Sequence, residues 1–509
     1  MERHDIILVC VGVYMLACLG GGIWAMRRTR SSQDFFMAGR SLGVLVTGFA
    51  VFSSTMSGFG FVGGPGLVYA MGLSSVWMVV CSTMGNTFSF LLLGKRLRFL
   101  AELRDTVSLP EAIHARYRSE LTRFLSATAI ILGVGGYLGT QVKAMGTVLS
   151  TILASHPDLP SVSIEMAMFI SCAVLAFYCA TGGILAGVYT DLLQGGVMVV
   201  AAIFVFVTAI GSVDGGVSGI SETLANDDPE SVSPWGTFGA LGCLSWYFLF
   251  ACGAAGQPHV ITKLMMTKRV ADARTILPLS FIAFTLSALL WIGIGTAMRT
   301  LVIQGEHAAL SEVDHAAPEF LNTYAHPLLA GLVFAGLFAA IMSTADSFLN
   351  IGAAACVNDL PKSVTAFASK FCSEERVAHW RAHPLFKNQL MWARIATVGL
   401  LYLAAMFALY TEDFLALLGA FGWGTFAAAL VPTVAIGFNW KRATATAANV
   451  AMAVSLAINF TVQLRGIKLP YGVSVGAVSL LVSLTLFFGI SLLSKPQPID
   501  KDVEAVMDL

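Results

Sequence analysis

The chain of 509 residues is 56% hydrophobic and only 12% charged, and its formal net charge is zero. So little charge excludes a soluble globular protein, because such proteins carry about 25% charged residues. The balanced charge provides no overall basic surface that would attract nucleic acid. The composition therefore predicts a polytopic membrane protein, in which the position of each charge matters more than the sum.

Apolar segments recur along the whole chain. A membrane span needs about 20 mostly apolar residues. By that criterion the sequence predicts an all-α protein with about thirteen transmembrane helices, near residues 5–26, 43–70, 74–94, 121–153, 163–181, 187–211, 236–256, 275–299, 322–357, 390–410, 413–438, 444–463 and 472–493.

The charges of the connecting loops alternate. Basic residues follow the third, seventh and eleventh predicted helices, for example Arg104, Lys263 and Lys441. Acidic residues follow the sixth and eighth, for example Asp227 and Glu312. The loop with Arg465 and Lys468, on the predicted outer side, is an exception. Short loops rich in arginine and lysine stay in the cytoplasm. The amino terminus is therefore expected outside and the carboxyl terminus inside.

In the second predicted helix, residues 49–66 are rich in serine, threonine and glycine. The seventh predicted helix carries the similar segment ACGAAGQPH at 251–259. A break near 53–57 would free backbone carbonyls for a cation, although a small-residue packing face is the alternative. Two interrupted helices, five helices apart, predict inverted repeats with a binding site between them. The expected single transporter domain over 1–509 comprises a peripheral helix 5–26, repeats 43–211 and 236–438, peripheral helices 444–493 and a cytoplasmic tail 494–509.

The ninth helix combines apolar residues with Ser343, Thr344, Asp346 and Ser347. Their spacing puts these oxygens on one helical face, which suits a hard monovalent cation. A carboxylate within a membrane helix indicates a functional site. Asp191 in the sixth helix is either a second source of negative charge for a cation or a carboxylate near the membrane surface.

The fourth helix carries Tyr137 and Gln141 on one face and Lys143 on another. A lysine at this depth must pair, reach the surface or meet an anionic ligand. Histidines such as His259 are expected at helix ends or in loops, and none of the common catalytic motifs occurs. The sequence therefore predicts that the protein is not an enzyme.

Five segments together resemble the sodium:solute symporter family, which includes bacterial proline, pantothenate and sialic acid symporters and animal sodium/glucose transporters. They are DFFMAGRSLG (34–43), the serine-rich break, TGGILAGVYTDLLQ (181–194), GQPHVITKLM (256–265) and AAIMSTADS (339–347). The resemblance implies a LeuT-type core of five plus five inverted helices, formed by helices 2–6 and 7–11. It also implies sodium as the coupling ion and a bacterial cytoplasmic membrane as the location.

The resemblance also implies cation ligands. The positions that match the family's sodium site are the backbone carbonyls of Ser53, Met56 and Ala340 and the hydroxyls of Ser343 and Thr344. Some members hold a second sodium, and the matching positions here are Asp191, Ser343, Asp346 and Ser347. Because Asp346 stands where the sialic acid symporters carry serine, a second sodium and a proton are both left open.

The expected solute contacts depart from those of the proline symporter. Thr55 stands where that symporter has an aspartate, and its aromatic positions match Phe250 and Ala254 here, which argues against proline. Candidate solute contacts in helices 2, 4, 7 and 11 are Ser54, Phe59, Tyr137, Gln141, Phe250, Gln257, Phe421 and Trp423.

The predicted function is sodium-coupled import of a small polar organic solute, such as a monocarboxylate, an amino acid or a vitamin-like compound, by alternating access. The expected partners are the solute, sodium and membrane lipid, and no nucleic acid. The alternative is a solute sensor of the same fold that acts with a separate signalling partner.

Overall fold

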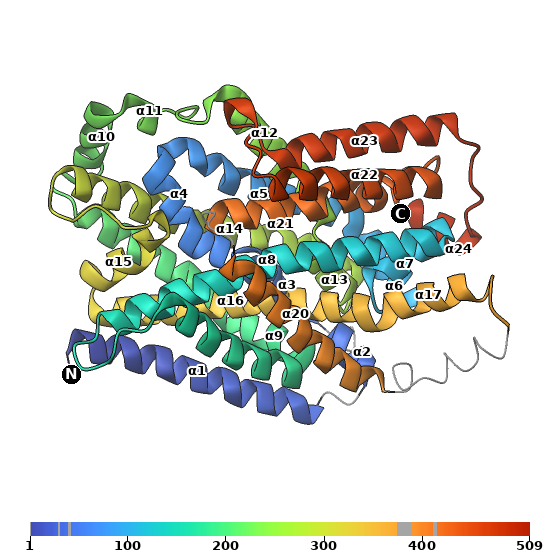
Figure 1. The fold of residues 1–509 in the computed structure, drawn as a ribbon, viewed down its shortest axis with the longest axis horizontal. Coiled ribbons are helices and arrows are strands. Elements are labelled where there is room, and N and C mark those ends of the chain that lie inside the picture. The colour runs from blue at the N-terminus through green and yellow to red at the C-terminus, as the bar shows by residue number, and fades with distance from the viewer. Residues whose placement is uncertain (1, 29–30, 39–41, 374–387, 411–414) are drawn as a thin grey trace.

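The computed structural model describes residues 2–28, 31–38, 42–373, 388–410 and 415–509 (Figure 1). Residues 39–41 of the DFFMAGRSLG segment, and 413–414 at the start of the predicted eleventh helix, therefore lie outside the described residues. Within the described residues all regular structure is helical, apart from one isolated bridge between Leu42 and Thr267.

The first half of the chain forms α1 (Arg3–Arg28), α2 (Ser32–Met37), α3 (Val44–Thr55), η2 (Phe59–Gly63), α4 (Gly64–Met71), η3 (Gly72–Val76), α5 (Trp77–Ser89), η4 (Phe90–Gly94), α6 (Lys95–Leu103), α7 (Leu109–Tyr117), α8 (Glu120–Ala154), α9 (Ile164–Gly211), α10 (Gly216–Asp227), α11 (Pro229–Val232), α12 (Gly239–Gly253), η5 (Ala254–Gly256) and α13 (Pro258–Met265). The second half forms η6 (Val270–Asp272), α14 (Ala273–Ile303), η7 (Val313–His315), α15 (Ala316–Thr323), α16 (Pro327–Ala354), η8 (Ala355–Asp359), α17 (Leu360–Ala368), α20 (Gln389–Leu409), α21 (Leu415–Leu430), η9 (Val431–Ile436), α22 (Ala445–Leu464), η10 (Pro470–Gly472), α23 (Val475–Leu493) and α24 (Lys501–Met507).

Twelve helical segments among the described residues are long and apolar enough to cross a membrane, against about thirteen expected from the sequence. The difference lies at the third predicted helix, near residues 74–94, where the chain forms η3, α5 and η4 in place of one long α-helix. α3 is an additional apolar helix, shorter than a full span. Glycine and proline between 58 and 66 explain why the second predicted helix is divided into α3, η2 and α4, because both destabilise a continuous helix.

The predicted fifth and sixth helices are confirmed as the two helical segments of α9, which are separated by a bend at Gly183. Gly183 has a φ of 56°, in the region that favours glycine, and a Cβ there would lie 2.5 Å from the Phe35 ring. Glycine is therefore required at this bend. The segment after the bend carries Asp191 toward α16.

α16 lies at the centre of the molecule. It packs against α1, α3, α8, α9 and α20, and nearly every residue from Val333 to Ala355 is buried. Figure 1 shows α1 along one edge of the molecule and α22 and α23 along the opposite edge. Polar side chains in the middle of α16 are consequently enclosed by protein on every side.

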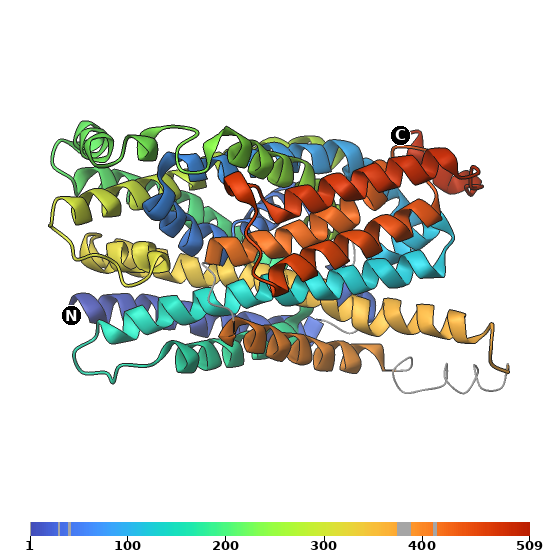
Figure 2. The same ribbon diagram turned by 45° about the horizontal axis from the view of Figure 1, so that its top comes forward.

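The loops of opposite predicted charge lie at opposite ends of the long axis. Figures 1 and 2 place the amino terminus and the acidic α10–α11 region at one end, and α24 toward the other. α24 docks there through the buried side chains of Val503, Val506 and Met507. Exposed ion pairs join Arg104 to Asp500 and Asp502, and Lys441 to Glu504. The carboxyl-terminal tail is thus a helix held against two loops that the sequence predicts to be basic.

Candidate sodium and solute site

The break predicted in the second helix begins at the end of α3. Met56 has φ −85° and ψ 80°, outside the helical region, and the chain becomes helical again at η2. A Cβ on Gly58 would lie 2.7 Å from the Ala144 Cβ of α8, so this approach of the two backbones requires glycine. The carbonyls at the end of α3 therefore face neighbouring elements rather than the next helical turn.

The predicted sodium ligands gather where this break meets α16. The Ser53 and Ser343 hydroxyl oxygens lie 3.0 Å apart. The Thr344 hydroxyl lies 2.9 Å from the Ala340 carbonyl and 3.0 Å from the Ser54 carbonyl. These residues are at most 2% exposed, and Met56 lies at the break itself. Neutral hydroxyl and carbonyl oxygens from two helices thus form one buried cluster, and hard cations prefer oxygen ligands.

The residues of the second predicted cation site lie close by. The Asp346 carboxylate is 1% exposed and contacts the Cys179 thiol, and its Oδ2 has no hydrogen-bond partner among the described residues. A Cβ on Gly187 would lie 2.0 Å from this oxygen, so glycine makes room for it on α9. The Ser347 hydroxyl donates to the Ser343 carbonyl of its own helix.

Lys263 overturns one expectation from the sequence, which placed it in a basic loop. It lies within α13, is 1% exposed, and its Nζ is 3.1 Å from Asp191 Oδ2. The same ammonium donates to the Ala50 carbonyl over 2.7 Å. The physical reason is that a carboxylate on α9 pairs the charge and so allows it to be buried. The run VITKLMM, in which Lys263 is flanked by apolar residues, was the available signal.

Four aromatic rings cluster beside the break. Three belong to the solute candidates Phe59, Phe250 and Trp423, and the fourth is Trp291. The Phe59 and Phe250 rings lie 5.9 Å apart and nearly parallel, and Trp423 lies 5.2 Å from Phe250. Trp291, which the sequence did not single out, lies edge-on 5.7 Å from Phe59. Phe421 instead contacts Phe460 of α22, so it belongs to a different cluster.

The polar solute candidates lie beside this aromatic cluster. Gln141 Oε1 accepts from the Gly58 backbone N–H over 2.9 Å, and the Tyr137 hydroxyl lies 3.2 Å from that of Ser57. Gln257 Nε2 donates to the Trp423 carbonyl over 3.1 Å. Gln141 Nε2, Gln257 Oε1 and Trp423 Nε1 have no hydrogen-bond partner among the described residues. These three buried polar atoms are available to a ligand.

The hydroxyls of the solute candidate Ser54 and of Thr55, which replaces the aspartate of the proline symporter, face their own helix. The Ser54 hydroxyl donates to the Ala50 carbonyl over 2.7 Å, and that of Thr55 donates to the Val51 carbonyl over 2.8 Å. In this arrangement Ser54 contributes its backbone carbonyl to the cluster.

His259 lies at a helix end, as predicted, but the sequence reasoning did not single it out as a site residue. It is the second residue of α13 and is 1% exposed. Its ring centroid lies 4.4 Å from that of Phe348 and 6.5 Å from that of Tyr137, and neither ring nitrogen has a hydrogen-bond partner among the described residues. Its position within GQPH, next to the expected contact Gln257, was the signal that could have found it.

Lys143 lies away from this polar group, toward the end of the molecule that carries η7. It is half-buried and interacts electrostatically with Asp314, which favours the pairing predicted as one of its alternatives. Asp314 accepts from the Leu415 backbone N–H at the start of α21 over 2.9 Å. Burial raises the pKa of Asp314 to about 6, and the Leu415 hydrogen bond and Lys143 oppose that rise.

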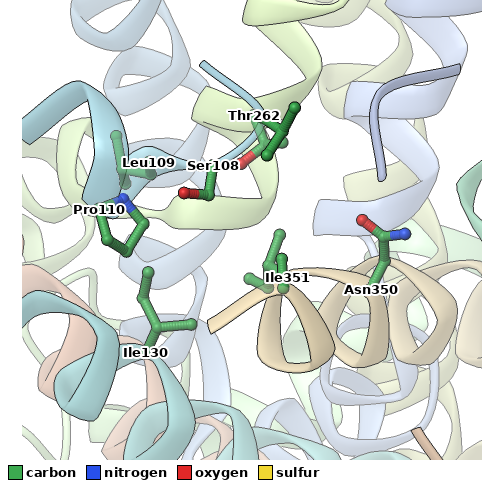
Figure 3. Close-up of a pocket in the computed structure, with 9 residues that line it drawn as sticks. Ser108, Leu109, Pro110, Ile130, Thr262, Asn350 and Ile351 are labelled. Atoms are coloured by element: carbon green, nitrogen blue, oxygen red, sulfur yellow. The ribbon is translucent and has the colours of Figure 1, made fainter. Parts of the chain in front are cut away.

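A small cavity lies beyond the cation residues, toward α17. Figure 3 shows Thr262 of α13 and Asn350 of α16 on one side of it and Ser108 to Pro110 at the start of α7 on the other. Asn350 follows Ser347 by less than one helical turn. The cavity is bounded by a contact between α7 and η8, in which the Ser108 hydroxyl donates to Asp359 over 2.7 Å.

Solved structures share the fold of this chain. A Na⁺-coupled sialic acid symporter aligns with a TM-score of 0.75 at 19% identity, covering 97% of this chain and 99% of its own. MHP1, a nucleobase-cation-symport-1 family transporter, aligns with a TM-score of 0.54 at 13% identity, covering 93% and 98% respectively. The fold is therefore the all-helical LeuT type of a membrane transporter.

The sequence relationships define the family. The Sodium:solute symporter family matches residues 35–455, and the chain belongs to this family. The osmoregulated proline transporter OpuE of Bacillus subtilis is 27% identical over 459 residues, which cover 89% of this chain and 87% of that protein. The sodium/pantothenate symporter of Haemophilus influenzae is 26% identical over 475 residues, 90% of each chain. The protein is an integral membrane transporter that uses sodium as its coupling ion.

Proposed function

We propose that the protein imports a small polar organic solute with sodium held by Ser53, Met56, Ala340, Ser343 and Thr344. The observation that carries this proposal is the buried oxygen cluster between α3 and α16, in which Thr344 reaches the Ser54 carbonyl over 3.0 Å. A sodium ion there would replace the contacts that these groups now make with one another. Its ligands would come from two helices that meet at the break.

Coupling follows from that bridging position. A ligand shifts a conformational equilibrium only by the difference between its affinities for the two states. A sodium ion bound to both α3 and α16 favours the conformations in which the two helices stay together. Gly58, which follows the α3 carbonyls by a few residues, holds Gln141 through its backbone N–H. The sodium and solute positions are therefore connected through the break.

The solute would lie against the Phe59, Phe250 and Trp423 rings. Gln141 Nε2 and Trp423 Nε1 offer hydrogen-bond donors and Gln257 Oε1 offers an acceptor, while His259 can do either according to its tautomer. This lining suits a compact solute with an apolar body and several polar atoms, such as a monocarboxylate, an amino acid or a vitamin-like compound. The relatives named for proline and pantothenate support a carboxylate-bearing solute.

We place the amino terminus outside the cytoplasmic membrane and α24 inside. The basic loops that dock α24 support this orientation, since such loops stay in the cytoplasm. The cavity bordered by Ser108 and Thr262 then lies between the cation cluster and the cytoplasmic end, where it would serve as the start of a release route.

Transport by the purified protein in liposomes tests the function. Uptake of radiolabelled proline, pantothenate, monocarboxylates and sugars would be measured with an inward sodium gradient, an inward proton gradient or none. We expect accumulation of one solute class with the sodium gradient, and its loss in Ser343→Ala. Solute binding without accumulation under any gradient would contradict transport and favour the sensor.

A further inference from the structure

The Lys263 ammonium occupies a buried position between three helical segments. From α13 it reaches Asp191 on α9, with 3.1 Å between Nζ and Oδ2, and the Ala50 carbonyl on α3 over 2.7 Å. Both charged side chains are 1% exposed. Removing two charges from water is costly, and the attraction between the two side chains, together with the Ala50 hydrogen bond, offsets that cost.

This ammonium holds the carboxylate on which the expected second cation site depends. Asp191 also interacts with the Ser53 and Ser343 hydroxyls, so it lies beside the sodium cluster. A second sodium ion at Asp191, Asp346 and Ser347 would have to share that carboxylate with Lys263. Lys263 therefore already supplies one positive charge beside the expected second cation site.

The local charges agree with a single sodium ion. Asp191 and Lys263 are the charged groups of the described residues that act on Asp346. When Asp346 is ionised, the two carboxylates and the ammonium leave one negative charge, which one sodium ion at the oxygen cluster neutralises. When Asp346 is protonated, Asp191 and Lys263 neutralise each other, so no negative charge remains for a second sodium ion. A second sodium would leave an excess positive charge in a region of low dielectric constant, where an uncompensated charge is strongly disfavoured.

We propose that the Lys263 ammonium takes the place of a second coupling cation, so that the transporter binds one sodium ion per cycle. The inference rests on the proposed sodium site and adds its stoichiometry. Removing the ammonium while keeping both carboxylates should therefore create a second sodium site.

Equilibrium binding of radioactive sodium to the purified protein in detergent counts the ions without knowledge of the solute. We expect one sodium per wild-type chain with a Hill coefficient near 1. Lys263→Met should bind two, with a Hill coefficient that rises toward 2, whereas Lys263→Arg should bind one. The double variant Lys263→Met with Asp191→Asn should return to one, because the new site requires that carboxylate. A merely structural ion pair would give no gain of sodium.

Two sodium ions bound by the wild type, or one by a folded Lys263→Met, would overturn the inference and leave the proposed function intact. No sodium bound by a folded wild-type protein would overturn both. If Lys263→Met does not fold, Lys263→Gln keeps a polar side chain without the charge, and the wild-type count decides independently of any variant.

Discussion

Replacing Thr344 by alanine tests the sodium cluster most directly. The hydroxyl lies within 3.0 Å of the Ser54 carbonyl and 2.9 Å of the Ala340 carbonyl, so it sits among the other predicted ligands. A hydrogen bond to a charged group contributes about 1.5–3 kcal/mol, and we take a similar value for one ligand of a buried ion. At about 1.4 kcal/mol per factor of ten, the sodium concentration for half-maximal uptake should rise at least roughly tenfold.

The assay is solute uptake by proteoliposomes over a range of sodium concentrations, with choline replacing sodium. Thr344→Ser retains the oxygen and should behave nearly as the wild type. Thr397→Ala is a matched control, because that buried hydroxyl donates to the Ala393 carbonyl of its own helix, α20. A half-saturating sodium concentration in Thr344→Ala within twofold of the wild type would refute the assignment of the hydroxyl as a ligand.

Three further predictions concern packing and charge. Gly58→Ala places a methyl group 2.7 Å from the Ala144 Cβ; we expect a loss of about 1–3 kcal/mol by thermal unfolding, and little change in Gly135→Ala, where the space is open. Burial raises the pKa of Asp314 from 3.8 to about 6, so the folded state binds this proton more tightly, and its contribution to stability should be lost as the pH rises from 4 to 6. Asp314→Asn should remove that part of the pH dependence of the melting temperature, and an unchanged profile would contradict it. Val503→Ala removes fully buried methyl groups from α24 and should increase proteolysis of the tail. Arg104→Gln should increase it less, because the ion pairs of Arg104 with Asp500 and Asp502 are exposed. Equal cleavage of the two variants would contradict this ranking.

The sequence predicted those features that depend on composition within one helix. Hydroxyls and a carboxylate in the otherwise apolar α16 are conspicuous because such groups are costly in a membrane. Serine and glycine clusters likewise indicated the break after Thr55, which the structure places at Met56. Long apolar segments gave nearly the whole helix order. All these signals are local, so they need no knowledge of which helices are neighbours.

Features that depend on neighbours were missed or displaced. Lys263 was assigned to a loop because its partner, Asp191, lies 72 residues away in the sequence. His259 was placed at a helix end, and the contacts with Tyr137 and Phe348 that bury it come from two other helices.

The arrangement of the break explains why sodium and solute affinities should change together. Ser53 and Ser54 present their carbonyls to α16 on one side of Met56, and Gly58 donates its N–H to Gln141 on the other. An ion that orders the first group restrains the backbone that positions the second. Binding linkage is reciprocal, so a factor by which sodium tightens solute binding must equal the factor by which solute tightens sodium binding. Loss of the Thr344 hydroxyl should therefore weaken solute binding at fixed, subsaturating sodium, whereas saturating sodium should restore it. Solute affinity that stays low at saturating sodium would mean that Thr344 acts on the solute directly rather than through the ion.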